Sequence, residues 1–433
     1  MTLRDAGITL IDCDHRTPEN RGIGYPYIAI PQLKDGHIHL DGSERRISQD
    51  DFVEWTKKLK PQANDVIVVR RCSSGDSAVV PPDFECAIGQ NLVILRADGT
   101  KVSPPFLRWL VRSDDWWEQV RKYINVGAVF DSLKCREIPG FELPIPPITA
   151  QREIAAVLSA LDDRITLLRE TNATLEAIAQ ALFKSWFVDF DPVRAKQEGR
   201  APEGMSDATA ALFPDSFEES ELGLVPKGWR ISTVADLCST ITNGGTPSRS
   251  KVELWEGGTI PWFKTGEFND GFLLQSAERI TRNALATSAA KLLPENSVLM
   301  AIYAAPTVGR LGVLTEPSTF NQACTGMVAK ETVGVWFLFW TLYFGRDWFN
   351  SRANGAAQQN ISKAIVSAYR VVSPSDSVLL AFNEIATSIH HRIRRNSEQA
   401  QTLATLRDTL LPRLISGQLR LPEAEALIEE ATA

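Results

Sequence analysis

Several signals that would assign this 433-residue chain to a special class of protein are missing from its sequence. The longest apolar run, Val335 to Phe344, is far shorter than the roughly 18 residues that a membrane-spanning helix needs. Charges at Arg4 and Asp5 precede any apolar stretch, which is not the pattern of a signal peptide. The six cysteines never form a CxxC pair, so neither a zinc ribbon nor a redox pair is written. We therefore expect a cytoplasmic protein with reduced thiols, no membrane anchor, no metal and no cofactor of its own.

Sequence motifs for catalysis are missing too. The chain has no GxxxxGK[ST] phosphate loop, no HExxH, and no Asn-Pro-Pro-aromatic or Asp-Pro-Pro-aromatic segment of an amino-methyltransferase. Its net charge of −7 argues against a protein that coats nucleic acid without regard to sequence, because such binding depends on many Lys and Arg side chains. We expect a non-catalytic protein, in which any nucleic-acid contact is confined to local basic faces.

What the sequence does contain is an internal repeat, which is best sought before any other feature. Short segments of the first half recur in the second half in the same order, with a shift that falls from 235 (271 − 36) to 228 (355 − 127). The matched segments are Tyr25–Ile28 with Ile260–Phe263, Asp35-Gly36 with Asp270-Gly271, Arg46–Ser48 with Arg279–Thr281, and Gly127-Ala128 with Gly355-Ala356. The repeat predicts two similar domains made of short strands and an aromatic amphipathic helix.

Each half ends in a long heptad pattern. No proline or glycine occurs between Pro147 and Pro192, which predicts an unbroken helix over about 149–186, and the same apolar phase returns 228 residues later. Such a heptad is typical of a helix packed along another helix, so we predict an intramolecular coiled coil, antiparallel if a two-fold axis relates the halves. Its seam is expected at Ile154, Leu158, Leu161, Ile165, Leu168, Asn172, Leu175 and Leu182, and at Phe382, Ile389, Ile393, Asn396, Leu403 and Leu410.

Two seam positions are polar. Asn172 and Asn396 stand where an apolar residue is the rule. A buried amide costs stability but can fix the register of two helices. The sequence leaves open whether these residues set the register or are tolerated polar residues near the seam.

Several segments resemble the specificity subunit of type I restriction-modification systems. They include Leu143–Pro147, Gln151–Ala155, Leu161–Ile165, Ala181–Pro192, Gly223–Trp229, Gly244–Ser248, Asn321–Ala323, Gln359–Ser362 and Leu410–Pro412. The first domain departs from the pattern, because it begins with Gly7–His15, which does not match the motif at Gly223–Trp229. No base contact is therefore transferred from the family to the first domain.

The resemblance implies a subunit that selects the DNA sequence for a larger complex. The implied partners are double-stranded DNA, two methyltransferase subunits and two restriction (motor) subunits, and those subunits would use S-adenosylmethionine, ATP and Mg²⁺. Two different readers on one spacer imply an asymmetric, bipartite target. The acidic balance favours one rival hypothesis, a coiled-coil scaffold whose repeated domains bind another protein or a glycan.

Together these features predict an α+β protein, with two similar mixed α/β target recognition domains joined by two long antiparallel helices that form the coiled coil. The expected parts are a first recognition domain (1–147), a central long helix (148–190), a linker (191–222), a second recognition domain (223–374), a C-terminal long helix (375–420) and an acidic tail (421–433).

The candidate DNA contacts are basic and polar residues in loops between predicted strands. Arg pairs well with guanine and Asn or Gln with adenine in the major groove, while Lys and Arg hold phosphates. The candidates are Arg70, Arg71, Ser73 and Ser74 in the first half, and Ser248, Arg249, Lys251, Lys264, Tyr303, Thr307, Gln358, Gln359 and Asn360 in the second.

Overall fold

The computed structural model describes residues 1–58, 60–127, 130–303, 307–352 and 360–432. The chain divides into two compact units, which we call unit 1 (Met1–Leu167 with Gln399–Ala433) and unit 2 (Leu168–Glu398). Each unit holds one mixed domain and one half of each long helix, α4 (Ile148–Phe187) and α12 (Asp376–Ile415). Among the described residues, no helix is both long and apolar enough to cross a membrane.

The domain of unit 1 contains two main sheets. The larger is antiparallel, in the order β1 (Ile8–Asp12), β9 (Leu92–Ala97), β6 (Val66–Val69) and β7 (Ser77–Val79). The smaller has the order β5 (Arg45–Ile47), β2 (Tyr25–Ile28) and β8 (Ala87–Ile88), with β2 and β8 parallel. The hairpin β3 (Leu33–Lys34) and β4 (His37–Ile38) and the helices α1 (Gln49–Trp55), α2 (Pro104–Leu110) and α3 (Asp114–Tyr123) complete it.

The domain of unit 2 has the same plan with additions. Its larger sheet has the order β13 (Cys238–Asn243), β20 (Cys324–Ala329), β17 (Val298–Ala301), β18 (Leu311–Leu314) and β15 (Gly271–Leu273). Its smaller sheet has the order β16 (Glu278–Ile280), β14 (Ile260–Phe263) and β19 (Thr319–Phe320). The additions and helices are β12 (Arg230–Thr233) paired with β21 (Arg370–Ser373), α7 (Val234–Leu237), α8 (Arg282–Thr287), α9 (Val335–Phe344), α10 (Arg346–Ser351) and α11 (Lys363–Ser367).

The strand registers contain the duplication that the sequence predicts. In unit 1, Tyr27 of β2 pairs in parallel with Ala87 of β8, and in unit 2, Trp262 of β14 pairs in parallel with Thr319 of β19. The two pairs are separated by 235 (262 − 27) and 232 (319 − 87) residues, which are shifts found in the sequence repeat. The two-domain α+β fold with a long helix pair is confirmed.

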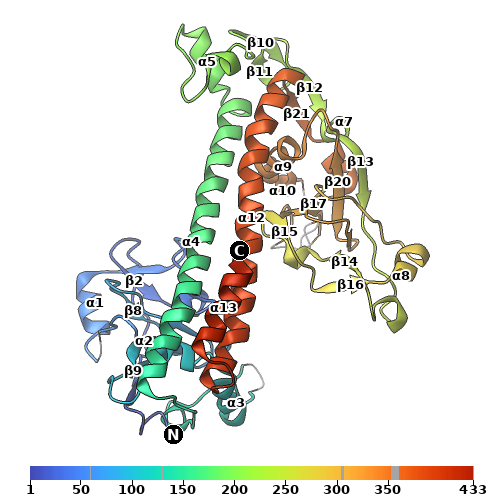
Figure 1. Ribbon diagram of the computed structural model, residues 1–433. Coiled ribbons are helices and arrows are strands. Elements are labelled where there is room, and N and C mark those ends of the chain that lie inside the picture. The colour runs from blue at the N-terminus through green and yellow to red at the C-terminus, as the bar shows by residue number, and fades with distance from the viewer. Residues whose placement is uncertain (59, 128–129, 304–306, 353–359, 433) are drawn as a thin grey trace. The chain divides into compact units, whose positions relative to one another are not determined.

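In unit 2 the two long helices run side by side in opposite directions (Figure 1). Asn172 and Asn396 meet across the pair, and further along α4 the ring of Phe183 packs against Phe382. The amide of Asn396 donates to Asn172 Oδ1 at 2.9 Å, and that of Asn172 donates to the Ile393 carbonyl at 3.1 Å. Both seam amides are thus hydrogen-bonded to the opposite helix. The expected seam residues are buried, except for Leu175, Leu182 and Ile389, which are half-buried.

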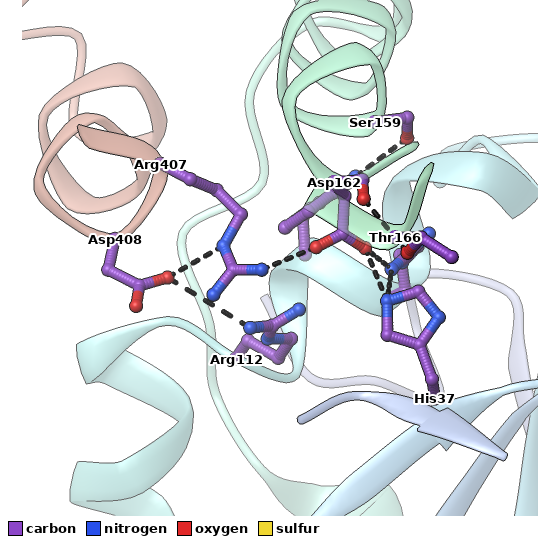
Figure 2. Close-up of polar contacts among 9 residues, drawn as sticks. His37, Arg112, Ser159, Asp162, Thr166, Arg407 and Asp408 are labelled. Carbon is purple, nitrogen blue, oxygen red and sulfur yellow. Dashed lines mark hydrogen bonds and ion pairs between the residues drawn. The ribbon is translucent and has the colours of Figure 1, made fainter. Parts of the chain in front are cut away.

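In unit 1 a buried ionic network joins the helices to the domain (Figure 2). Asp162 of α4 accepts hydrogen bonds from His37 of β4 at 2.7 Å, from Arg108 of α2 and from Arg407 of α12. Burial raises the pKa of Asp162, but its bond to His37 and the charges of Arg108 and Arg407 outweigh burial and hold the pKa well below the usual range. The Asp162 carboxylate has an exposed fraction of 1%, and two guanidinium groups from two different helices stabilise it as an anion.

Two segments that were expected to be a linker and an acidic tail form regular secondary structure. The segment expected as a linker forms α5 (Asp191–Gln197), α6 (Asp207–Ala210) and the start of a hairpin, β10 (Phe217–Ser220) with β11 (Gly223–Pro226). Its Val193 and Phe213 are buried in the core of unit 2, so the segment is packed rather than a free tether. The acidic tail forms a helix, α13 (Leu421–Thr432), because no proline or glycine interrupts it after its first turn.

Candidate nucleic-acid interface

Three loops of unit 1 meet at one end of the larger sheet. β1 ends at Asp12 and β6 ends at Val69, and these residues pair with Val93 and Leu92 at the beginning of β9. The loops beyond these ends surround a cavity of about 890 Å³. Its lining, which we call the first loop face, consists of Asp12, His15, Arg70, Arg71, Gln90, Asn91, Lys134, Cys135 and Arg136.

The first loop face carries four basic side chains, Arg70, Arg71, Lys134 and Arg136, and a single carboxylate, Asp12. Arg70 is largely buried, and its Nε lies 3.8 Å from Asp12 Oδ1, so its positive charge is partly neutralised by Asp12. Arg71 is exposed, and its guanidinium lies 5.2 Å from the ring centre of Phe130. Surplus positive charge in a concave surface suits a phosphate backbone and the acceptor edges of bases.

Backbone pairing holds this face in place. The Cys72 amide donates to the Asp131 carbonyl at 3.1 Å, and the Leu133 amide donates to the Arg70 carbonyl at 2.8 Å. Ser73 is exposed, whereas Ser74 is buried and its hydroxyl donates to the carbonyls of Arg70 and Asp131. Ser74 therefore supports the loop from inside, which corrects its expected place among the residues that face DNA.

Unit 2 has an equivalent loop arrangement, which we call the second loop face. Arg71 forms an isolated bridge with Ser132, and Tyr303 forms one with Asn360. The partners differ by 232 (303 − 71) and 228 (360 − 132), so Tyr303 and Asn360 occupy the repeat positions of Arg71 and Ser132. The other members of this face are Asn243, Thr246, Asn321 and Gln322 at the ends of β13 and β19.

The second loop face is built from amides and hydroxyls instead of guanidinium groups. Thr325 donates to Asn243 Oδ1 at 2.8 Å, and the Thr246 hydroxyl donates to Gln322 Oε1. Tyr303 has an exposed fraction of 39%, and the Thr307 hydroxyl lies 3.4 Å from the Tyr303 carbonyl. The candidates Gln358 and Gln359 lie outside the described residues.

Two other candidates, Arg249 and Lys264, converge on one carboxylate. Arg249 forms a two-point ion pair with Glu278, and Lys264 Nζ lies 2.7 Å from the same carboxylate. Arg249 also stacks over Trp255, with its guanidinium carbon 3.7 Å from the ring centre. The hydrogen bonds that Glu278 accepts from Arg249 and Lys264 lower its pKa to about 2. The cluster keeps one net positive charge.

Two further candidates, Ser248 and Lys251, lie in the same loop as Arg249 and are exposed. The hydroxyl of Ser248 lies 2.9 Å from that of Ser250, and its carbonyl accepts from Trp255 Nε1 at 3.2 Å. Lys251 is exposed as well. These two candidates are accessible to a ligand, while Arg249 is held by aromatic and acidic neighbours.

Sequence reasoning named only Arg70 and Arg71 of the first loop face and missed its seven other members: Asp12, His15, Gln90, Asn91, Lys134, Cys135 and Arg136. The repeat could have found Gln90, because Gln90 and Gln322 are 232 residues apart and Asn321–Ala323 already resembled a family segment. In both units this glutamine contacts the loop after the first strand of the larger sheet: Gln90 donates to the His15 carbonyl at 3.0 Å, and Gln322 accepts from Thr246. Lys134 and Arg136 carry no comparable signal.

Comparison with known proteins gives consistent results. Residues 13–177 and 226–378 match a family model described as "Type I restriction modification DNA specificity domain". The chain is 27% identical over 375 residues to the HindI specificity subunit of Haemophilus influenzae, covering 77% of this chain and 81% of that one. It is 24% identical over 402 residues to the MjaIX specificity subunit of Methanocaldococcus jannaschii, covering 92% and 87%. A crystal structure of the S subunit of a type I system from M. genitalium shares the fold, with a TM-score of 0.57 at 15% identity and coverage of 96% and 95%.

Proposed function

Since this chain belongs to the family of type I restriction-modification DNA specificity proteins, we propose that its two loop faces read the two halves of one bipartite DNA target. The protein is the sequence-specific DNA-binding subunit of such a system, and it directs methyltransferase and restriction subunits to the target. The observation that carries the proposal is the presence of two equivalent loop faces with different side chains. Different side chains at equivalent positions imply two different half-sites, and hence an asymmetric target.

The partners follow from the same role. Its relatives are named as specificity subunits of type I restriction enzymes, and we propose that this chain is a non-catalytic subunit that assembles with the other subunits of such an enzyme. We assign two methyltransferase and two restriction subunits to the complex, because each unit offers one domain and one segment of helix pair. S-adenosylmethionine, ATP and Mg²⁺ would be used by those subunits, which work with this chain in the cytoplasm, where the DNA lies.

The rival hypothesis, a scaffold whose domains bind a protein or a glycan, is not favoured. Its only support is the acidic net charge, and the basic residues are gathered locally on the first loop face in spite of that charge. A sequence-specific DNA-binding protein needs such local positive charge, but its net charge does not have to be positive.

The proposal is tested on the assembled complex by sequencing methylated DNA from cells that express the partner subunits. The double variant Arg70→Ala/Arg71→Ala should lose selectivity in one half-site only, because each lost base contact costs about 1–3 kcal/mol. The control Arg121→Ala/Lys122→Ala removes the same charge from exposed residues of α3 that do not line the first loop face. Unchanged selectivity in both half-sites would remove the first loop face from the interface.

A further inference from the structure

Each unit has a cavity where its domain meets the long helices. The cavity has a volume of about 580 Å³ in unit 1 and about 260 Å³ in unit 2, and we call them the first and the second junction cavity. Their linings correspond in the repeat, at shifts of 235 (270 − 35) and 228 (340 − 112 and 408 − 180). Asp35 and Gly36 correspond to Asp270 and Gly271, Val111 and Arg112 to Phe339 and Trp340, and Asp408 to Gln180. The duplication therefore contains the same cavity twice.

The second junction cavity has an aromatic wall. Trp336, Phe339, Trp340 and Tyr343 of α9 are spaced i, i+3, i+4 and i+7, so they share one face of the helix, and all four line the cavity. His390 of α12 stacks on Trp336 with ring centres 3.4 Å apart. Burial lowers the pKa of His390 to about 4, so its ring is uncharged at neutral pH. The faces of such rings attract a positively charged group.

Two carboxylates line the same cavity, and its described lining contains no Lys or Arg. Asp270 is already neutralised, because its Oδ1 accepts hydrogen bonds from Arg346 and from the Leu311 amide. Glu176 of α4 has no ion-pair or hydrogen-bond partner within the described part of the chain. Although Glu176 remains accessible to solvent, the protein packed around its carboxyl group and the charge of Asp270 raise its pKa. An added cation beside Glu176 would stabilise its ionised form.

The first junction cavity has the same excess of negative charge. Its lining contains two cations, Lys34 and Arg112, and four carboxylates, Asp35, Asp76, Asp114 and Asp408. Each cavity thus has two more carboxylates than cations (4 − 2 = 2 and 2 − 0 = 2). Trp117 gives the first cavity an aromatic side chain as well. Because the two linings share their charge balance while most of their side chains differ, one kind of positively charged ligand suits both cavities.

A buried donor without an acceptor occupies equivalent positions in the two linings. Trp340 has an exposed fraction of 4%, and its Nε1 has no hydrogen-bond partner among the described residues. Nη1 of Arg112, which stands 228 residues earlier, has none there either. Buried donors in proteins normally have an acceptor. A polypeptide segment brings carbonyl oxygens together with a basic side chain, whereas a metal ion or a small free cation brings no acceptor.

We propose that each junction cavity binds one Arg or Lys side chain of a methyltransferase subunit, with Glu176 as its counter-ion in unit 2. The inference rests on the proposed function, because it names where the methyltransferase subunits dock. A duplicated cavity fits a partner that is present in two copies, each of which inserts the same basic residue. The methyltransferase is the partner that must lie against this chain, because it modifies a base within the sequence that the loop faces read. A basic side chain enclosed by aromatic rings is a frequent anchor of protein interfaces.

The test titrates the full-length chain with purified methyltransferase subunit in a calorimeter. Glu176→Gln should weaken one of the two binding steps about tenfold and leave the other unchanged, because only the second junction cavity loses its counter-ion. Glu170→Gln is the matched control, since Glu170 is an exposed glutamate of the same helix and unit that does not line the cavity. Equal affinities for wild type and both variants would overturn the proposal.

A photo-crosslinking amino acid in place of the half-buried Tyr343 identifies what fills the second junction cavity. In the complex assembled with both partner subunits and DNA, it should cross-link to a methyltransferase peptide that contains Arg or Lys. A cross-link to the restriction subunit or to DNA, or none in an assembled complex, contradicts the proposal. Methylation that remains with Glu176→Gln should keep the wild-type sequence in both half-sites, which distinguishes a failure of this inference from a failure of DNA recognition.

Discussion

In each unit the domain contacts the helix pair at an equivalent place, but the contact is ionic in unit 1 and aromatic in unit 2. In unit 1 the junction is ionic, and Asp162 of α4 is held by His37, Arg108 and Arg407 (Figure 2). The repeat position of Asp162 in α12 is His390 (162 + 228 = 390), and the junction of unit 2 around it is aromatic. His390 stacks on Trp336 of α9, with ring centres 3.4 Å apart, and its Nδ1 lies 2.7 Å from the Ala386 carbonyl.

This difference teaches that the duplicated backbone fixes where the junction lies, while the side chains decide how it responds to conditions. An ionic junction fails when a partner is removed, because the remaining charges stay buried without compensation. An aromatic junction depends on packing, and here also on a histidine that must remain neutral. Burial lowers the pKa of His390 to about 4, against a weaker opposing effect of its bond to Ala386.

The largest expected effect comes from removing the central anion of unit 1. Asp162→Ala leaves Arg108 and Arg407 buried without their shared carboxylate, which should lower the free energy of unfolding by about 3–5 kcal/mol. Urea unfolding of the purified protein measures this. Asp163→Ala is the control, because Asp163 is the exposed neighbour on the same helix. A loss as small as that of the control would show that the ionic junction contributes little.

The next effect is a pH dependence confined to unit 2. The folded pKa of His390, about 4, lies below its ordinary value of 6.5, so its contribution is complete above about pH 6.5 and is lost as the pH falls towards 4. The loss is at most about 3.5 kcal/mol, because the range from 6.5 to about 4 spans about 2.5 pH units at about 1.4 kcal/mol each. His390→Phe should remove this part of the profile while keeping an aromatic ring beside Trp336.

The comparison must be made between wild type and variant at each pH. Glu176 lines the same cavity as His390, and burial together with the charge of Asp270 raises its pKa, so its contribution changes with pH in the opposite direction. Unfolding monitored by tryptophan fluorescence from pH 4 to pH 7.5 gives the difference. Parallel profiles of the two proteins would show that His390 does not titrate as described.

The smallest effect concerns the contacts between α4 and α12. In unit 1 the two helices are joined by the ion pair of Asp162 and Arg407, and in unit 2 by the amides of Asn172 and Asn396. Asn172→Leu leaves the buried Asn396 amide without its acceptor, which should cost about 1–3 kcal/mol. Adding Asn396→Leu should restore most of that stability, because no polar group is then left unsatisfied. If Asn172→Leu alone raised the melting temperature and left the assembly unchanged, the amides would have no role in the register.

The sequence and the structure agree best where a pattern is local or periodic. The heptads predicted the bounds of both long helices to within a few residues, because an apolar heptad sustained over such a length is formed only by a helix packed along another helix. The repeat related the segment of Tyr303 to the loop of Arg70 and Arg71, since duplicated strands carry their loops with them, whereas the pairing of Tyr303 with Asn360 came from the structure. Ser74 could not be distinguished from Ser73 in the sequence, because burial of one hydroxyl depends on the carbonyls of a segment that lies 57 residues away in the chain.

The sequence by itself therefore determined the duplication, the two helices and the family. Only the tertiary structure decided which side chains meet: Arg249 and Lys264 with Glu278, and Asp162 with His37, Arg108 and Arg407. The physical reason is that periodicity reports on a helix or strand one element at a time. Contacts between loops and across helices arise from chain closure over long separations, which leaves no regular spacing to read.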